Sequence, residues 1–402
     1  MKAFNLQLFN LLAASFLLSC VNETNVSAQN PVETNRPTAD YKPAFAGQTR
    51  IKGIKTTTPY ATTVINKKLE NPWAISVMPD GRFLITQKGG TMVILAANGS
   101  LSKTITELPK VDDSGQGGLL DVTLAPDFAK SRMVYWAYSE PQSKGILLAI
   151  AKGKLSANET AIENQTVIYR ATPAHTGRLQ YGSRIVFDKN GNLFVSTGER
   201  SDREIRVHAQ YLNSSLGKIL HLTPDGKAVA GGPFVTKEGA RPEIYSLGHR
   251  NPDGLAIDPQ TGELWEAEFG PKGGDEINLI KPGKNYGWPI ITYGVEYSGA
   301  KIGDAIQQKD GYEQPVYYWN PVISPGSIAF YTGNLSEWKG NLFVAALSGS
   351  HIIRLVLKAN KVVGEERLLA DEGERFRDLV TGKDGALYAV TDGGKLYRIA
   401  KK

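Results

Sequence analysis

The chain has 402 residues, of which 41% are hydrophobic and 21% charged, a balance that is ordinary for a globular protein with a large core. This composition excludes disorder as the default, and the length fits one large all-β unit as well as two or three average domains. The formal net charge of +6 would suit an acidic ligand. Lysine and arginine are nevertheless spread along the chain without a basic block, so no nucleic-acid partner is expected.

The first twenty residues have the pattern of an export signal. Lys2 is the only charge, an apolar run continues to Leu18, and Cys20 follows in "LLSC". The run is short for a membrane span, but its length is typical of a signal peptide. Cys20 is the only cysteine, which excludes an intrachain disulfide framework, and it lies where a bacterial lipoprotein signal places the lipidated cysteine. An ordinary cleaved signal with an incidental cysteine is the alternative.

We therefore expect a lipoprotein-type signal peptide at residues 1–20, a flexible tether at 21–55 and one folded domain at 56–402. The tether region is polar, rich in Asn, Thr and Pro, and lacks periodicity. The predicted location is the periplasm or the outer membrane, with the lipid at Cys20 as the only membrane contact. The sequence predicts neither the membrane leaflet nor the oligomeric state.

From about residue 60 onward one unit recurs: an apolar run, a turn of the Asp-Gly or Asn-Gly type, and an alternating apolar strand. Six copies, the second of them looser, occur at 73–87, 119–139, 184–198, 254–268, 327–347 and 377–391. Two strands joined by a glycine turn indicate a hairpin, and repetition of the unit indicates an array of blades. We predict an all-β fold, a six-bladed β-propeller of four-stranded antiparallel blades. A two-sheet sandwich is the alternative, because turn signals alone do not determine closure.

Two loops carry candidate ligand-binding side chains. In "DDSGQGGLLDV" (112–122), glycines surround the amide of Gln116 just ahead of a strand, which lets backbone approach a flat ligand closely. "LGHRNPDGLAID" (247–258) places Arg250 and Asn251 ahead of an apolar strand, followed by Pro252 and a glycine turn. The planar fork of an arginine suits carboxylates. An arginine that caps local carbonyls is the alternative interpretation.

The stretch "EFGPKGGDEINLIKPGKNYGWP" (268–289) has the oxygen donors of a calcium site. Gly270 and Pro271 can expose two successive carbonyls, Glu276 supplies a carboxylate at the start of a strand, and the turn at Tyr286 offers further carbonyls. In an extended strand Glu276 and Asn278 share one face. The alternative is an ordinary pair of turns with a solvated Asp-Glu corner.

In "GERFRDLV" (373–380), Arg375 and Arg377 point to the same face if the backbone is extended. An isolated arginine pair usually lies in solvent. If these two and Arg250 share the mouth of one propeller, they indicate a ligand with several negative charges.

Together these segments resemble the soluble PQQ-dependent sugar dehydrogenases, the glucose/sorbosone dehydrogenase family, and within it the aldose sugar dehydrogenase branch. The similarity extends from about residue 60 to 400, and its most specific motifs are "GQGGLLDV", "LGHRNPDGLA", "GPKGGDEINLIKPGKNYGWP", "VEYSG" and "RFRDLVTGKDGALYAVTD". The resemblance implies a six-bladed propeller that binds pyrroloquinoline quinone (PQQ), a planar ortho-quinone with three carboxylates, over calcium. It also implies oxidation of an aldose or related alcohol by hydride transfer to the quinone, with an external electron acceptor such as a quinone or cytochrome.

The resemblance also implies roles for individual residues. By position, the residues that match cofactor contacts are Gln116, Arg250, Asn251, Tyr297, Arg375 and Arg377. Gly270 and Pro271 match carbonyl ligands of the cofactor-bound calcium, and Glu276 and Tyr286 match a structural calcium site.

The chain departs from the family at the catalytic position. The family's proton-accepting histidine precedes a Gly-x-Arg-apolar-Val strand, and here "LQYGSRIVFD" has Gln180 in its place. A glutamine amide cannot accept a proton at neutral pH. His175 on a different loop path, or Glu199 through a water, are the two candidate substitutes. A family lysine near the cofactor is also replaced, by Ser348.

The sequence thus leaves three functions open. The first is a PQQ- and calcium-dependent sugar oxidoreductase. The second is a propeller that binds the quinone or a sugar with little or no turnover because of Gln180. The third is a calcium-dependent, lactonase-like hydrolase, although the usual acidic metal cage is not evident in the sequence. The sugar and the electron acceptor are not predicted.

Overall fold

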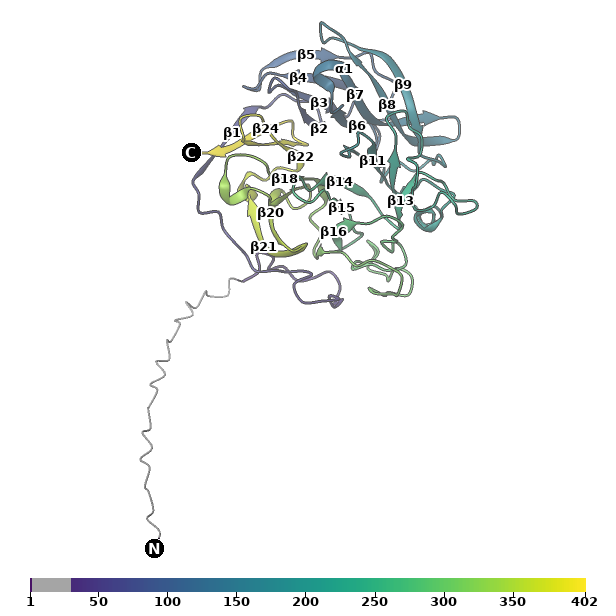
Figure 1. Cartoon of the computed structure of the whole chain (residues 1–402), viewed down its shortest axis with the longest axis vertical. Helices are drawn as coiled ribbons and strands as arrows, with labels where there is room; N and C mark the ends of the chain where they lie inside the picture. The colour runs from purple at the N-terminus through teal and green to yellow at the C-terminus, as the bar shows by residue number, and fades with distance from the viewer. Residues whose placement is uncertain (2–29) are drawn as a thin grey trace.

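The computed structural model describes Met1 and residues 30–402, and almost all of its regular structure in this range is β-strand. The strands of the described residues form six four-stranded antiparallel sheets. The sheets lie around a common centre as the blades of a propeller (Figure 1). This confirms the predicted fold class, and the sandwich alternative is wrong.

In blades 1 to 5 consecutive strands pair as a meander and the innermost strand comes first in the sequence; blade 6 follows the same order through β22, β23 and β24, and β1 supplies its outermost strand. Blades 1 to 3 are formed by β2 (Pro72–Val77), β3 (Phe83–Gln87), β4 (Thr91–Leu95) and β5 (Leu101–Ile105); by β6 (Leu119–Leu124), β7 (Met133–Gln142), β8 (Gly145–Leu155) and β9 (Ile162–Arg170); and by β10 (Gly182–Phe187), β11 (Leu193–Thr197), β12 (Lys218–Leu222) and β13 (Ile244–Leu247). Blades 4 to 6 are formed by β14 (Pro252–Ile257), β15 (Leu264–Glu268), β16 (Asp275–Ile280) and β17 (Tyr317–Trp319); by β18 (Pro325–Phe330), β19 (Leu342–Ala346), β20 (His351–Lys358) and β21 (Lys361–Leu368); and by β22 (Phe376–Thr381), β23 (Leu387–Thr391), β24 (Leu396–Lys401) and β1 (Tyr60–Asn66).

The helical elements are short and connect strands. They are α1 (Phe128–Ser131), η1 (Arg206–Gln210), η2 (Ser336–Trp338) and η3 (Ala370–Glu372). The repeated glycine turns join the first two strands of a blade. Gly81 (φ 87°) and Gly191 (φ 79°) lie at equivalent places in blades 1 and 3, where a positive φ lets the chain reverse without a side-chain clash.

The ring is closed by the two ends of the domain. β1 pairs antiparallel with β24, with Tyr60 opposite Lys401, so the N-terminal strand completes the last blade. Apolar clusters then lie between consecutive blades, including the contact between blades 6 and 1, where the rings of Phe83 and Tyr388 are 4.5 Å apart. Because each sheet packs both of its faces against neighbours, strands such as β3 and β19 are buried on both faces.

Every blade carries a β-bulge near the start of its innermost strand. The register shifts at this point in all six pairs of first and second strands. Bulges re-aim side chains, and the bulge residues that line the cavity described below include Trp73, Asp253 and Arg377. The predicted glycine turn at Pro252-Asp253-Gly254 is therefore wrong, because these residues open β14 with a bulge.

One arginine connects the innermost strands below this level. Arg184 of β10 is buried, and its guanidinium is 2.8 Å from a carboxylate oxygen of Asp121 and 3.2 Å from one of Asp378. It contacts a residue from the innermost strand of every other blade: the ring of Trp73, the carboxylates of Asp121 and Asp378, and the backbone carbonyls of Asp253 and Gly326. Below the cavity, the centre of the ring is thus occupied by one arginine that is paired with two carboxylates.

The predicted tether does not hold for residues 30–55, which lie on the edge of blades 4 and 5 (Figure 1). Gln48 is 0% exposed; its amide nitrogen donates to the carbonyl of Pro315 at 2.9 Å and its amide oxygen accepts from the hydroxyl of Tyr293 at 3.1 Å. Ile54 donates its N–H to the carbonyl of Glu365 at 2.9 Å. The polar composition of this segment reflects hydrogen bonding to the blades.

The signal peptide at residues 1–20 with Cys20, and the start of the predicted tether, lie outside the described residues apart from Met1. In the part of the chain that the structure describes, no helix has the length and apolar character needed to cross a membrane.

Candidate active site

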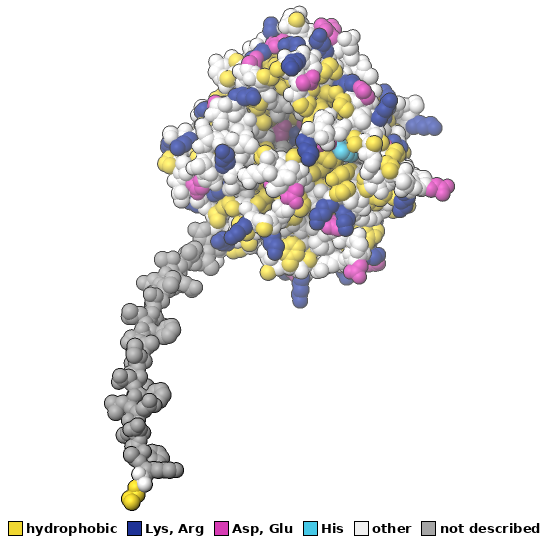
Figure 2. Space-filling view, in the orientation of Figure 1, with side chains coloured by type: hydrophobic (Ala, Val, Ile, Leu, Met, Phe, Trp, Pro, Cys, Tyr) yellow, Lys and Arg dark blue, Asp and Glu magenta, His cyan; other side chains and the backbone are white. Residues whose placement is uncertain are grey.

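The principal cavity opens at the end of the ring where the innermost strands begin. Its volume is about 390 Å³, within the usual range of about 300–1,000 Å³ for small-molecule sites. All six blades contribute to its wall: Asn71, Pro72, Trp73, Lys88, Gly115, Gln116, Leu120, Tyr181, Gly182, Asp253, Phe269, Tyr297, Ser324, Leu347, Arg375, Arg377 and Asp392. The face drawn in Figure 2 is hollowed near the centre of the ring.

Two of the predicted cofactor arginines lie side by side in this wall. Arg375 and Arg377 both pair with Asp392, at 2.9 Å and 2.8 Å between the guanidinium Nε and a carboxylate oxygen. Burial opposes ionisation of Asp392, but the two arginines outweigh it and lower its pKa. The carboxylate of Asp392 therefore holds two guanidinium groups in place. Together with Lys88, these two groups give that side of the wall an excess of positive charge.

Tyr297 lies in the same wall and its side chain is 71% exposed, which is unusual for an aromatic ring. Gln116 also lines the cavity, but its amide oxygen accepts the N–H of Gln180 at 2.7 Å. The side-chain oxygen of Asn251 accepts the N–H of Gly182 at 3.0 Å. Gln116 and Asn251 thus hold the backbone at the start of β10 in place.

Gln180 is enclosed by charged neighbours. It is 4% exposed, has a positive φ of 53°, and is absent from the cavity wall. With its amide oriented to suit its neighbours, its oxygen accepts from Arg250 at 2.7 Å and 3.1 Å, and its nitrogen donates to Glu199. Burial raises the pKa of Glu199 to about 7, although Arg250 partly offsets the effect. Both ends of the Gln180 amide are thus occupied by protein groups.

The third predicted arginine lies behind Phe269, outside the principal cavity. The guanidinium of Arg250 donates to the carbonyls of Phe269 and Gly270 at 2.9 Å and 2.6 Å, and lies 5.2 Å from the ring centre of Trp288. Phe269 lines both the principal cavity and a second, smaller one. Arg250 therefore faces the predicted metal ligands, while Arg375 and Arg377 face the principal cavity.

The four predicted calcium ligands line the second cavity together. Its volume of about 10 Å³ has room for about one water-sized sphere. Gly270, Pro271, Glu276 and Tyr286 share its wall with Glu268 and Arg250. The family resemblance implies two separate calcium sites for these residues, whereas in the structure all four line one ion-sized space.

A cluster of buried acidic side chains lies next to this second cavity. Asn278 donates to a carboxylate oxygen of Glu266 at 3.0 Å and to Glu268 and Glu276 at 3.3 Å, which confirms that Glu276 and Asn278 share a strand face. Burial and the charge of Glu268 raise the pKa values of Glu266 and Glu276 well above normal. Ligand atoms of His249, Glu266 and Glu268 lie within 4.8 Å of one another.

Several polar atoms of this cluster have no hydrogen-bond partner within the described residues: Nδ1 of His249, Oε1 of Glu266 and Oδ1 of Asn278. Buried polar groups are normally paired, and closely spaced carboxylates repel one another unless a proton or cation separates them. Oxygen donors of this kind are those preferred by hard divalent cations. The residues present therefore fit such an ion.

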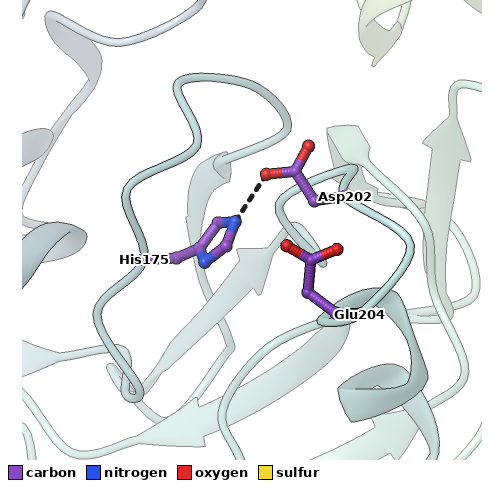
Figure 3. A group of neighbouring side chains, drawn as sticks. All are labelled: His175, Asp202 and Glu204. Carbon is purple, nitrogen blue, oxygen red and sulfur yellow. Dashed lines mark hydrogen bonds and ion pairs between the residues drawn. The ribbon is translucent and has the colours of Figure 1, made fainter.

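The alternative base His175 lies outside the principal cavity wall. Its Nε2 is 2.6 Å from a carboxylate oxygen of Asp202, and Glu204 lies beside the pair (Figure 3). Ligand atoms of the three side chains lie within 4.8 Å of one another, on partly or fully exposed residues. Ser348, at the position of the family lysine, shares a hydrogen bond of 2.7 Å with Ser324.

The sequence did not predict five charged residues of these two cavities or of the cluster behind them: Lys88, Asp253, Glu266, Glu268 and Asp392. Asp253 lies in the motif "LGHRNPDGLA", where the sequence predicts a turn. The strand "LWEAE" did carry a signal, because Glu266 and Glu268 follow apolar residues in a strand that is buried on both faces. An acid in such a strand needs a partner.

The fold and cavities define a closed β-propeller. Its central cavity is lined by arginine and lysine side chains, and beside it lies a second cavity of the size of one ion, lined by acidic side chains. The family model for Glucose / Sorbosone dehydrogenase matches residues 69–398. The chain is 40% identical over 345 residues to aldose sugar dehydrogenase YliI of Escherichia coli, covering 84% of this chain and 92% of that protein. It therefore belongs to the glucose/sorbosone dehydrogenase family, and the match lies within the predicted domain at 56–402.

Solved structures show the same similarity. The soluble aldose sugar dehydrogenase of Escherichia coli in its apo-form has a TM-score of 0.82 at 39% identity, covering 86% of this chain and 100% of that one. The PQQ-bound form of aldose sugar dehydrogenase from Streptomyces coelicolor has a TM-score of 0.71 at 28% identity, covering 85% and 98%. Membership of this sugar dehydrogenase family supports an oxidoreductase that acts on a small sugar.

Proposed function

We propose that this protein is a PQQ- and calcium-dependent oxidoreductase that oxidises an aldose and passes the electrons to an external acceptor. The observation that carries the proposal is the pair Arg375 and Arg377, held in one cavity wall by Asp392, in a member of a sugar dehydrogenase family. A planar polyanion would bind there by charge-assisted hydrogen bonds. The PQQ-bound relative supports the choice of cofactor.

The residues of this chain have separate tasks in the proposal. Arg375, Arg377 and Lys88 would hold cofactor carboxylates, and Tyr297 would cover the mouth of the cavity. When bound, PQQ supplies the electrophilic quinone that takes a hydride from the sugar. Calcium would bind in the small cavity between Gly270 and Glu276, next to the cofactor space that shares Phe269 with it.

The experiment is reconstitution of the mature chain with PQQ and calcium. Dye reduction across a panel of aldoses is measured together with the absorbance of the quinone. Turnover with a spectral change supports the oxidoreductase. A spectral change without turnover indicates the binding protein that the replacement by Gln180 favours, and lactone hydrolysis independent of PQQ indicates a hydrolase.

For location, we propose export with lipidation at Cys20, supported by the sequence pattern "LLSC". A Cys20→Ala variant should leave the membrane fraction for the soluble fraction. Retention of that variant at the membrane would contradict the anchor.

A further inference from the structure

Oxidation of a sugar hydroxyl requires a group that takes the hydroxyl proton. In this chain, the position at which the family has its proton-accepting histidine cannot supply that group. Gln180 cannot accept a proton, and both ends of its amide are bound by Arg250 and Glu199. Glu199 is 0% exposed and lies behind Gln180, away from the cavity wall. A base for this reaction must instead lie where a substrate can touch it.

The described wall of the principal cavity contains two carboxylates, Asp253 and Asp392. Asp392 pairs with Arg375 and Arg377, which lower its pKa and make it a weak base. Asp253 differs, because within the described residues its carboxylate forms no ion pair closer than 4 Å. It is 6% exposed and lies at the bulge that opens β14, which aims it into the cavity.

The charged groups that face Asp253 come from four strands: Arg377 of β22, Arg184 of β10, Asp121 of β6 and Glu266 of β15. The amide of its chain neighbour Asn251 also interacts with it. Burial raises the pKa of Asp253 to about 7, and Arg377 and Arg184 limit the increase. A base that is poised near the working pH is the most effective proton acceptor.

We propose that Asp253 is the general base of this enzyme and takes the proton of the sugar's anomeric hydroxyl, an inference that rests on the proposed function. In the step, the O–H bond breaks and its proton passes to a carboxylate oxygen of Asp253. The C–H bond breaks and its electron pair leaves as hydride to the oxidant, an ortho-quinone. The sugar carbon gains a C=O bond and is oxidised by two electrons, and Asp253 later releases the proton to water.

The test compares Asp253→Asn, which keeps the shape of the side chain, with Glu199→Gln, which removes the other buried acid whose pKa is near 7. In Asp253→Asn we expect kcat to fall about 10²–10⁴-fold, with the affinity for PQQ, followed by absorbance, within about threefold of the parent protein. The acid limb of the kcat/KM profile should disappear. Asp253→Glu should recover part of the rate, because it restores a carboxylate.

A second readout does not depend on turnover. Infrared difference spectra of the apo-protein between acid and alkaline pH should show a protonated-carboxyl band that titrates near neutrality. Part of this band should vanish in Asp253→Asn, whose melting temperature establishes that it is folded. Asp188→Asn, at a hairpin turn far from the cavity, is the matched control and should change neither rate nor band.

The outcomes separate the two proposals. Turnover by the parent protein that persists in Asp253→Asn, or that is lost in Glu199→Gln alone, overturns the role of Asp253 and leaves the proposed function intact. If the parent protein neither binds PQQ nor oxidises any aldose, the proposed function fails and the assignment of Asp253 fails with it.

Discussion

The guanidinium of Arg250 donates a hydrogen bond to the carbonyl oxygen of Gly270 at 2.6 Å. This carbonyl is one of the predicted calcium ligands, and a cation and a guanidinium beside the same oxygen would repel each other. Because the same guanidinium also holds the amide of Gln180, one side chain connects the predicted calcium ligands with the back wall of the principal cavity.

The first prediction concerns calcium and stability. Calcium should raise the melting temperature of the apo-protein, because an ion that binds only the folded state stabilises it by about 2.7 kcal/mol at 100 times its Kd. Glu268→Gln should lose most of this increase, since Glu268 lines the ion-sized cavity. Magnesium serves as the control ion. If neither calcium nor a chelator changes the melting temperature of the parent protein, the predicted calcium site is contradicted.

The second prediction concerns the pH dependence of the same cavity. Because burial and Glu268 raise the pKa values of Glu266 and Glu276, protons must leave before calcium binds, so the affinity should increase with pH. In the apo-protein these carboxyls bind more protons folded than unfolded. The free energy of unfolding should therefore fall as pH rises above the normal value of 4.5. Calorimetry between about pH 5 and 8, with and without calcium, measures both trends; an apo-protein that gains stability over this range refutes them.

The third prediction concerns cofactor affinity. Arg377→Ala should weaken PQQ binding about 10- to 100-fold, because a hydrogen bond to a charged group contributes about 1.5–3 kcal/mol. Absorbance titration of the quinone gives the Kd. Arg398→Ala is the matched control, since Arg398 pairs with Asp384 on the same blade and is outside the cavity wall. Equal losses of PQQ affinity in the two variants would show that the effect comes from the overall charge of the protein and not from a contact in the cavity.

The fourth prediction concerns Gln180. We expect Gln180→His to change kcat far less than the factor of about 10²–10⁴ that a general base supplies. The imidazole would be enclosed between Glu199 and Arg250, as the amide is, and could not reach a substrate. Stopped-flow reduction of the bound quinone measures the step directly. A gain of several hundredfold would show that this position, and not Asp253, limits catalysis.

The fifth prediction concerns the arginine at the centre of the ring. Arg184→Leu should lower the free energy of unfolding by about 3–5 kcal/mol, because it leaves the buried carboxylates of Asp121 and Asp378 without their partner. Urea titration measures the loss. Arg82→Leu removes an ion pair with Glu159 near the surface and should cost about 0–1 kcal/mol. A small effect of Arg184→Leu would mean that the carboxylates are neutral in the folded state.

The sequence alone predicted the six blades, since the turn at Gly81 and its counterparts and the alternating strands around them are local signals that each blade repeats. Sequence motifs also located Gln116, Arg375 and Arg377, because these residues lie just before or at the start of innermost strands and so at one end of the ring. Family membership followed from the same motifs.

Tertiary structure alone decided which charges meet. The bulge that turns Asp253 into the cavity depends on pairing with β15, and its surroundings come from strands β6, β10 and β22, far away in the chain. Arg250 faces Gly270 because the loop after β15 passes beneath it. Residues 30–55 are ordered because the edge of blades 4 and 5 offers partners for polar groups such as those of Gln48. Burial and charge pairing sum over all neighbours in space, so a pattern read along one strand cannot supply them.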